Sequence, residues 1–156
     1  MASEPTKDRI TCHVLDTSVG KPARGVRVKL ELTPPPVNNN TNNPAHSHGH
    51  HSAAGAAKVF ESQTDDDGRI KVWLPYSSAT SSGEVPVYTL EDVLGELEAA
   101  GAGATTWTLR FDTGAYYGLD NTFFPEVAVV FRVQEGQHYH VPLLLAPYSY
   151  STYRGS

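Results

Sequence analysis

The sequence is poor in the features that identify several large classes of protein. It holds a single cysteine, Cys12, and no apolar run approaches the roughly 20 residues that a membrane-spanning helix needs. One cysteine excludes a disulfide within the chain and is typical of a reducing compartment. The N-terminus lacks the charged and then apolar layout of a secretory signal. We therefore expect a cytoplasmic protein with no membrane partner, and a peroxisomal location remains open.

Positive charge is also scarce. The chain carries 12 Lys and Arg against 17 Asp and Glu, which gives a formal net charge of −5. A nucleic-acid partner would favour a basic face, so this balance argues against one. The length of 156 residues fits one domain, which we place at residues 1–156.

Two stretches of low complexity interrupt the chain, at residues 33–57 and 75–105. The first is rich in Pro, Asn and His, and the second begins with a Ser-rich run. Such compositions do not pack a core, so we expect both to be inserted loops, which cost little free energy to close. Within the second, residues 89–100 place leucines and a valine at helical spacing ahead of Gly101, which predicts a short helix.

The first insertion carries four histidines, at His46, His48, His50 and His51. A histidine-rich tract can bind a transition metal such as zinc, nickel or copper. A solvated tract with no metal is the interpretation that we favour. We expect no catalytic metal and no cofactor.

Elsewhere apolar and polar residues alternate, which is typical of half-buried strands. The pattern predicts strands at residues 10–16, 25–32, 58–63, 107–111 and 124–133, a short strand at 70–74, and a final hairpin at 138–156. A tight turn at residues 64–69 contains Asp67-Gly68, a pair that favours positive φ. About eight strands separated by turn signals predict an all-β sandwich of two antiparallel sheets.

Four positions could carry chemistry, although each has an ordinary interpretation when taken alone. His13 lies within a strand, where a histidine is more often structural than catalytic, and Arg69 follows a turn, where an arginine is usually an exposed charge. His138 and His140 share one face of a strand because side chains alternate with a period of two. Ser156 is the last residue of the sequence.

Together these positions resemble a known family. HVLD around His13, TxxDGR around Arg69, HYHVPLLL around His140 and the final YRGS are similar to the signatures of the 5-hydroxyisourate hydrolases, the enzymatic branch of the transthyretin-like family. The resemblance covers residues 10–32, 58–74 and 107–156. It implies a transthyretin-like sandwich with one short helix between the fifth and sixth strands, which we place in residues 113–121.

The resemblance also implies a site and a reaction. The catalytic set is His13, Arg69, His140 and Ser156, with substrate binding by Tyr153, Arg154 and Gly155 and a supporting role at most for His138. The reaction is the hydrolysis of 5-hydroxyisourate to 2-oxo-4-hydroxy-4-carboxy-5-ureidoimidazoline in urate catabolism. An imidazole supplies a base near neutral pH and a guanidinium stabilises an oxyanion. Which histidine is the base stays open.

The family assembles as a homotetramer, a dimer of dimers with the sites in a channel between the dimers. We therefore expect that a single chain has no concave pocket on this face. Two other functions stay open: a carrier that holds a small aromatic ligand without chemistry, and a metal-handling protein that acts through the histidine tract.

Overall fold

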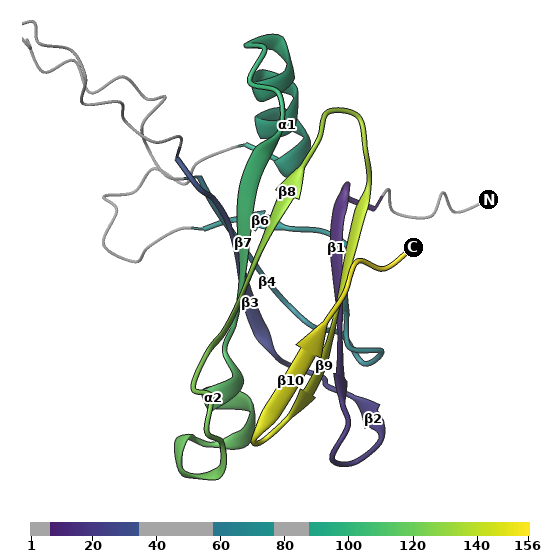
Figure 1. The fold of residues 1–156 in the computed structure, drawn as a ribbon, viewed down its shortest axis with the longest axis vertical. Coiled ribbons are helices and arrows are strands. Elements are labelled where there is room, and N and C mark those ends of the chain that lie inside the picture. Colours follow the sequence, from purple (N-terminus) through teal and green to yellow (C-terminus); the bar gives the residue numbers. More distant parts are fainter. Residues whose placement is uncertain (1–6, 35–57, 77–87) are drawn as a thin grey trace, which may run out of the picture.

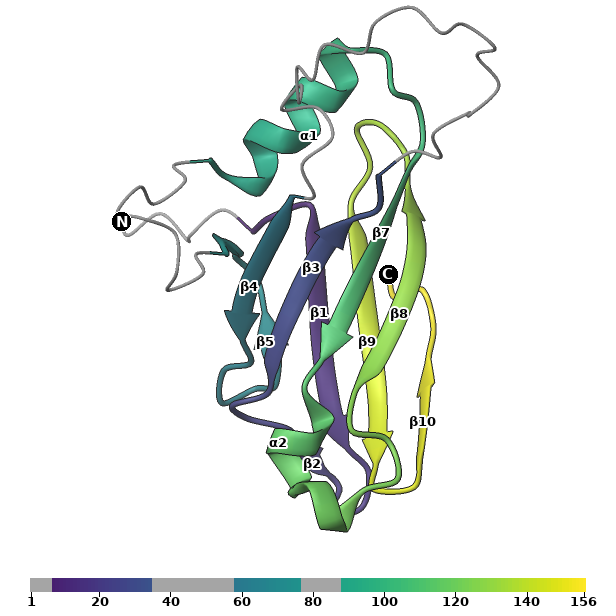
Figure 2. The ribbon, with the colours of Figure 1, turned by 90° about the vertical axis from the view of Figure 1, so that its left-hand side faces the viewer.

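The computed structural model describes residues 7–34, 58–76 and 88–156, and these form a sandwich of two β-sheets (Figures 1 and 2). The histidine tract lies outside the described residues. In the first sheet the strand order is β10-β9-β1-β2, and β5 also pairs with β1. Its strands are β1 (Ile10–Asp16), β2 (Lys21–Pro22), β5 (Arg69–Ile70), β9 (Tyr139–Ala146) and β10 (Ser149–Thr152).

The second sheet has the order β6-β4-β3-β7-β8, and every neighbouring pair in it is antiparallel. Its strands are β3 (Arg27–Leu32), β4 (Val59–Gln63), β6 (Leu74–Pro75), β7 (Thr105–Phe111) and β8 (Val127–Val133). In Figure 2, β3 and β7 of this sheet stand in front of β1 and β9. The predicted sandwich is confirmed.

The first sheet differs from the prediction in one respect, because it is mixed and not wholly antiparallel. β1 and β9 run parallel, with Thr11 opposite His140 and His13 opposite Pro142. The two strands come from the start and the end of the chain, so no tight hairpin joins them and fixes an antiparallel direction. This pairing brings the two ends of the chain together at the centre of the sheet.

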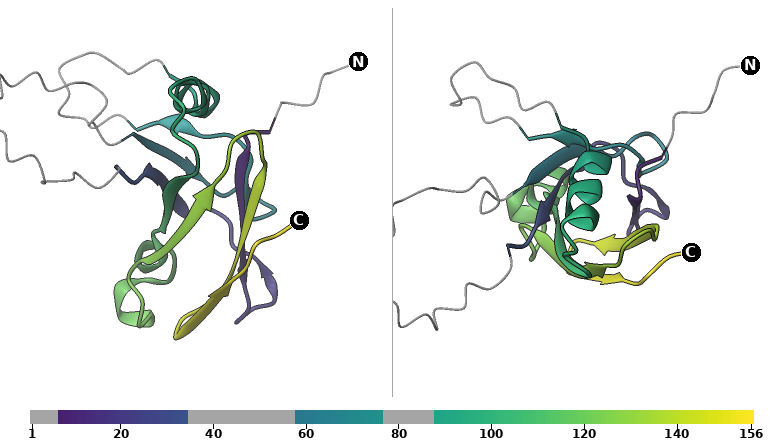
Figure 3. Two further views of the ribbon diagram at one scale, coloured as in Figure 1. Left: turned by 45° about the horizontal axis from the view of Figure 1, so that its top comes forward. Right: turned by 90° about the horizontal axis from the view of Figure 1, so that it is seen from above.

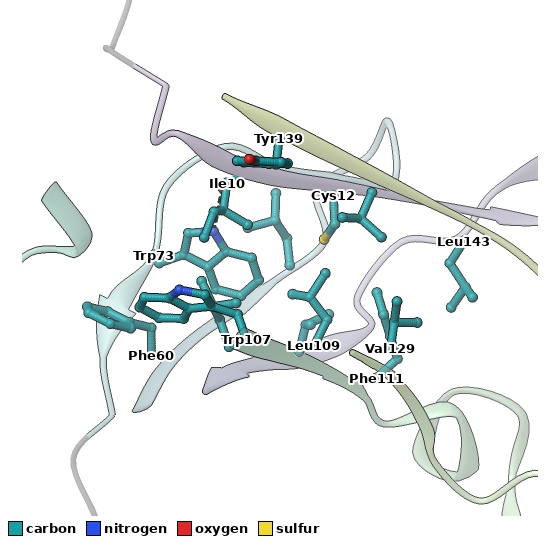
Figure 4. Packing of buried hydrophobic residues seen from close by; sticks show 14 of the residues in the cluster. Ile10, Cys12, Phe60, Trp73, Trp107, Leu109, Phe111, Val129, Tyr139 and Leu143 are labelled. Atoms are coloured by element: carbon teal, nitrogen blue, oxygen red, sulfur yellow. Dashed lines mark hydrogen bonds between the residues drawn. The ribbon is translucent and has the colours of Figure 1, made fainter. Parts of the chain in front are cut away.

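The core lies between the sheets, as the alternation predicts. Along β1 the side chains of Ile10, Cys12 and Val14 are buried, while the residues between them are partly exposed. Figure 4 shows Cys12 among the core side chains, which confirms it as a buried apolar filler. Trp73 and Trp107 are the largest members of this cluster that the figure labels, and the Trp73 indole donates to the Ile10 carbonyl at 2.8 Å.

The strand predicted at residues 70–74 is wrong as a single element. Its ends belong to different sheets, because Ile70 lies in β5 and Leu74 in β6. Between them the chain crosses the core edge and buries Trp73. The Asp8 carboxylate accepts the Trp73 backbone N–H at 2.8 Å, so the crossing is tied to the segment that leads into β1.

Two short helices cover opposite ends of the sandwich (Figures 1 and 3). α1 (Leu90–Ala99) matches the helix predicted at residues 89–100, with Thr89 and Asp92 forming a reciprocal cap. α2 (Thr113–Tyr117) and a following 3-10 turn lie between β7 and β8, where the family resemblance places a helix. No helix in the described parts of the chain is long and apolar enough to span a membrane.

α1 is attached to the start of β1 by charge as well as by apolar packing. Its apolar face, which includes Leu90 and Val93, joins the hydrophobic cluster. The guanidinium of Arg9, next to β1, donates to Glu91 at 3.0 Å and to Glu98 at 2.6 Å. The strand that carries His13 is thus fixed at its N-terminal end.

Candidate active site

An open cavity of about 510 Å³ lies on the outer face of the first sheet, where β1, β5 and β9 meet. Its lining comes from the sheet, from the segment before β1, from the residues at β5 and from the chain after β10. The predicted residues that line it are His13, Arg69, His138, His140, Tyr153, Gly155 and Ser156. The expectation that a single chain has no concave pocket here is wrong. The segments before β1 and after β10 form walls beside the sheet.

Strand register places Arg69 beside His13. β5 pairs with β1 so that the two residues are direct partners across the antiparallel ladder. The Asp65 carboxylate in the preceding turn accepts the backbone N–H groups of Asp67 and Arg69, both at 2.9 Å. The turn therefore fixes where the Arg69 side chain leaves the backbone.

Gly68 makes this turn possible, and the sequence had indicated it. Its φ is +73°, in the region that favours glycine. A Cβ at this position would lie 2.4 Å from the Val14 carbonyl oxygen. The Gly68 carbonyl also accepts the Val14 N–H at 2.8 Å. Close backbone contact between turn and strand thus requires a residue without a side chain.

The two histidines lie near each other on the same face. Their ring centroids are 6.3 Å apart and the planes are inclined by 33°. The Nδ1 atom of His140 lies 2.8 Å from the hydroxyl oxygen of Thr11, the residue opposite it in β1. Both imidazoles are half-buried, so each has one side on the protein and one toward the cavity.

The surroundings keep both imidazoles neutral near pH 7. Burial lowers the pKa of His13 from its ordinary value of 6.5, and the positive charge of Arg69 lowers it further. The Asp67 backbone and the carboxylates of Asp65 and Asp67 act in the opposite direction.

Burial is also the main cause that lowers the pKa of His140, followed by the charges of Arg69, His13 and Lys7. A neutral imidazole can accept a proton, which is what a general base requires. The cavity therefore holds two potential bases beside the guanidinium of Arg69.

The C-terminal segment closes one side of the cavity. The Gly155 N–H donates to the His140 carbonyl at 2.8 Å. A Cβ on Gly155 would lie 2.7 Å from Cδ2 of the His140 ring and 3.1 Å from Pro142 Cγ, so the chain passes directly over the imidazole. Tyr153 and Ser156 line the cavity and are exposed in the single chain.

Arg154 is the predicted site residue that does not line this cavity. Its guanidinium lies over the Tyr139 ring, with Cζ 4.8 Å from the ring centroid. Neighbours along an extended segment point to opposite sides, so Arg154 leaves the cavity face that Tyr153 and Gly155 share. The structure thus gives Arg154 a packing contact with Tyr139 outside the lining of this cavity.

Sequence reasoning missed Thr11 and the charges at the rim. Lys7, Asp8 and Lys71 line the cavity together with Arg69. Lysines outnumber carboxylates among these rim residues, although the whole chain is acidic, so the cavity suits an anionic ligand. Thr11 lies two residues before His13 and so shares its strand face. The spacing of Thr11 and His13 can be read from the sequence, but the parallel pairing that sets Thr11 opposite His140 cannot.

Comparison with known proteins identifies the family of the chain. Residues 10–155 match the family described as HIUase/Transthyretin family. The chain is 33% identical to a probable 5-hydroxyisourate hydrolase of Schizosaccharomyces pombe over all of both proteins. It is 34% identical to the 5-hydroxyisourate hydrolase of Salmonella typhi, over 100% of this chain and 87% of that protein. It is also 41% identical to the uric acid degradation bifunctional protein TTL of Arabidopsis thaliana, of which it spans 40%.

Solved structures of the same family have a similar fold. The 5-hydroxyisourate hydrolase of Klebsiella pneumoniae superimposes with a TM-score of 0.55 at 26% identity, over 94% of this chain and 98% of that one. Sea bream transthyretin in complex with thyroxine, at 21% identity and a TM-score of 0.57 over 95% of both chains, shares the fold. The chain belongs to the HIUase/transthyretin family.

Proposed function

We propose that this protein hydrolyses 5-hydroxyisourate to 2-oxo-4-hydroxy-4-carboxy-5-ureidoimidazoline in urate degradation. The observation that carries the proposal is the meeting of His13, His140 and Arg69 in one cavity, where burial and the charge of Arg69 lower the pKa of both imidazoles. Full-length relatives from yeast and bacteria bear the name of this enzyme. The reaction class is the addition of water to a ring carbonyl followed by cleavage of its bond to nitrogen.

In this reaction the imidazoles transfer protons and the guanidinium stabilises negative charge. A neutral imidazole takes one proton from water as the oxygen adds to the ring carbonyl. The resulting oxyanion is stabilised by the guanidinium of Arg69, which is beside His13 in the ladder. The oxyanion then reforms the carbonyl, the carbon–nitrogen bond breaks, and an imidazolium returns a proton to the departing nitrogen. No covalent intermediate and no cofactor is needed.

The C-terminal residues supply the substrate contacts in this proposal. Ser156 offers a hydroxyl at the cavity, and Tyr153 offers a large ring that limits the cavity to molecules of purine size. The extended backbone at Gly155 allows the chain to lie close to the His140 imidazole. Arg154 is not assigned a substrate contact, because its guanidinium lies over Tyr139.

A direct assay tests the proposal against the carrier alternative. Freshly generated 5-hydroxyisourate is mixed with the protein and its ultraviolet absorbance is followed. A hydrolase makes the absorbance decay faster than in buffer, in proportion to protein concentration. A carrier that binds a small aromatic ligand without chemistry leaves the decay at the buffer rate; sea bream transthyretin, which shares the fold, was solved in complex with thyroxine. That result would reject the enzyme.

We also propose that the protein works as a homotetramer, a dimer of dimers, in the cytosol. β10 ends the first sheet and β8 ends the second, so within the described residues both have a free edge for a second chain. Exposed apolar side chains at Val19 and Tyr148 lie in the two turns at one end of the first sheet. A mass near four chains by light scattering after gel filtration is expected, and a monomer would reject the assembly.

A further inference from the structure

Thr11 contacts one of the two cavity histidines from inside the sheet. It lies opposite His140 across the parallel ladder of β1 and β9, and its Oγ1 is 2.8 Å from His140 Nδ1. The same hydroxyl can donate to the backbone carbonyl of Tyr139, whose oxygen lies 3.5 Å away. Thr11 is half-buried and lines the cavity, two residues before His13 on the same strand face.

We propose that Thr11 is a positioning residue that holds His140 in the Nδ1–H tautomer, so that Nε2 faces the cavity with a free lone pair. This inference rests on the proposed hydrolase function, and it identifies His140 as the base that takes the proton of water. The hydrogen bond made by one imidazole nitrogen decides which nitrogen carries the proton.

The hydroxyl geometry supports this tautomer. A threonine hydroxyl has one hydrogen but two lone pairs. The Tyr139 carbonyl can only accept, so a hydroxyl that donates toward it presents its lone pairs to Nδ1 of His140. With the hydroxyl in this orientation, Nδ1 is the donor.

The same arrangement suits both charge states of His140. If Thr11 donated to Nδ1, the neutral ring would already carry its hydrogen on Nε2 and could accept no proton from the cavity side. With Nδ1–H donating to Thr11, protonation at Nε2 leaves this hydrogen bond unchanged. The hydroxyl therefore need not rotate when the base is protonated.

The first test is spectroscopic and does not depend on turnover. Long-range ¹H–¹⁵N correlation spectra of the assembled protein at pH 8 are expected to show neutral His140 with Nδ1 protonated and Nε2 bare. Thr11→Val keeps the shape of the side chain and removes the hydroxyl, so a mixture of tautomers is expected. Thr11→Ser restores the hydroxyl and the single tautomer. A wild-type His140 protonated on Nε2 would overturn the proposal.

The second test is kinetic. Because supporting hydrogen bonds of this kind typically contribute about 10- to 100-fold, kcat of Thr11→Val should fall by that factor while KM changes by less than about threefold. Thr11→Ser should recover most of the activity. Thr106→Val, the same change on β7 of the other sheet, serves as the control and should match the wild type.

The outcomes separate the two proposals. A wild-type protein that does not hydrolyse 5-hydroxyisourate rejects the function, while the tautomer spectrum still tests the role of Thr11. An active enzyme in which Thr11→Val keeps both the tautomer and kcat rejects Thr11 as a positioning residue and leaves the function standing.

Discussion

The outer faces of the two sheets follow the same alternation of buried and exposed residues, yet their charges are arranged in opposite ways. On the second sheet opposite charges are paired. Arg110 on β7 donates to Glu31 at 3.0 Å and to Glu126 at 2.7 Å, and these carboxylates raise its pKa. On the first sheet His13, His140 and Arg69 share one cavity, and among the described residues Arg69 has no carboxylate within ion-pair distance.

This difference separates a structural surface from a reactive one. Paired charges neutralise each other and have little tendency to bind a ligand. A guanidinium without a carboxylate partner attracts an anion and lowers the pKa of the imidazoles beside it, and perturbed groups of this kind are enriched at functional sites. The comparison predicts that substitutions on the first sheet change activity, whereas those on the second change stability slightly.

The largest effect is expected from His140→Asn. The amide removes the base while keeping a similar size, so kcat/KM for 5-hydroxyisourate should fall on the order of 10²- to 10⁴-fold. Absorbance decay under steady-state conditions measures the loss, and circular dichroism checks the fold. Activity within threefold of wild type would mean that His140 is not the base, and would move that role to His13.

Arg69→Gln should have the next largest effect. Loss of the charge that stabilises the oxyanion should lower kcat about 10²- to 10³-fold. It should also change the pH profile, because burial and Arg69 together lower the pKa of His13 and His140. Without Arg69 both values should rise toward 6.5, so the acid-side loss of activity should begin at higher pH.

NMR titration of the two imidazoles measures this change directly. Arg24→Gln is the matched control, because Arg24 is paired with Asp66 in the turn beside Arg69 and does not line the cavity. It should leave both pKa values and the pH profile unchanged. Histidine pKa values that stay the same in Arg69→Gln would show that the charge of Arg69 does not lower them.

Local signals in the sequence predicted the turn and the strand that position the site residues, whereas the residues themselves were assigned from the family resemblance. Asp67-Gly68 indicated a tight turn, and the turn does deliver Arg69 beside β1. Alternation placed Cys12 in the core and His13 on the other face. Such signals act within a few residues, so they can be read from the chain directly.

What the sequence did not predict depends on contacts between distant segments. The parallel pairing that sets Thr11 against His140 joins residues that are 129 positions apart. The cavity in a single chain also needs the segments before β1 and after β10 to stand beside the sheet. Arg154 was assigned to substrate through its motif, but its side chain turns to Tyr139, a contact that no local pattern specifies.

Gly155→Ala should have a smaller effect on activity than the substitution of His140 or Arg69. The added methyl would lie 2.7 Å from Cδ2 of the His140 ring, so either the ring or the C-terminal segment must move. A displacement of about 1 Å in a catalytic group can cost up to about 100-fold, and we expect a 10- to 100-fold fall in kcat.

Gly95→Ala in α1 is the control for this glycine substitution. A Cβ there meets nothing within 4 Å, so activity should be unchanged. The helix should be stabilised by roughly 0.5–1 kcal/mol, because glycine loses more conformational freedom on folding than alanine. Wild-type kcat in Gly155→Ala would show that the C-terminal segment does not hold the His140 ring.

The smallest effect is expected on the other sheet, from Arg110→Gln. Its two ion pairs are exposed to solvent, with 42% of the Arg110 side chain accessible, so water and salt screen them. The free energy of unfolding should fall by at most about 1 kcal/mol, and kcat and KM should match the wild type. Urea denaturation at low and at 1 M salt measures the loss, which should shrink at high salt because screening weakens the pairs. A fall in kcat as large as that of Arg69→Gln would mean that the paired face also takes part in the reaction, and the contrast between the two faces would fail.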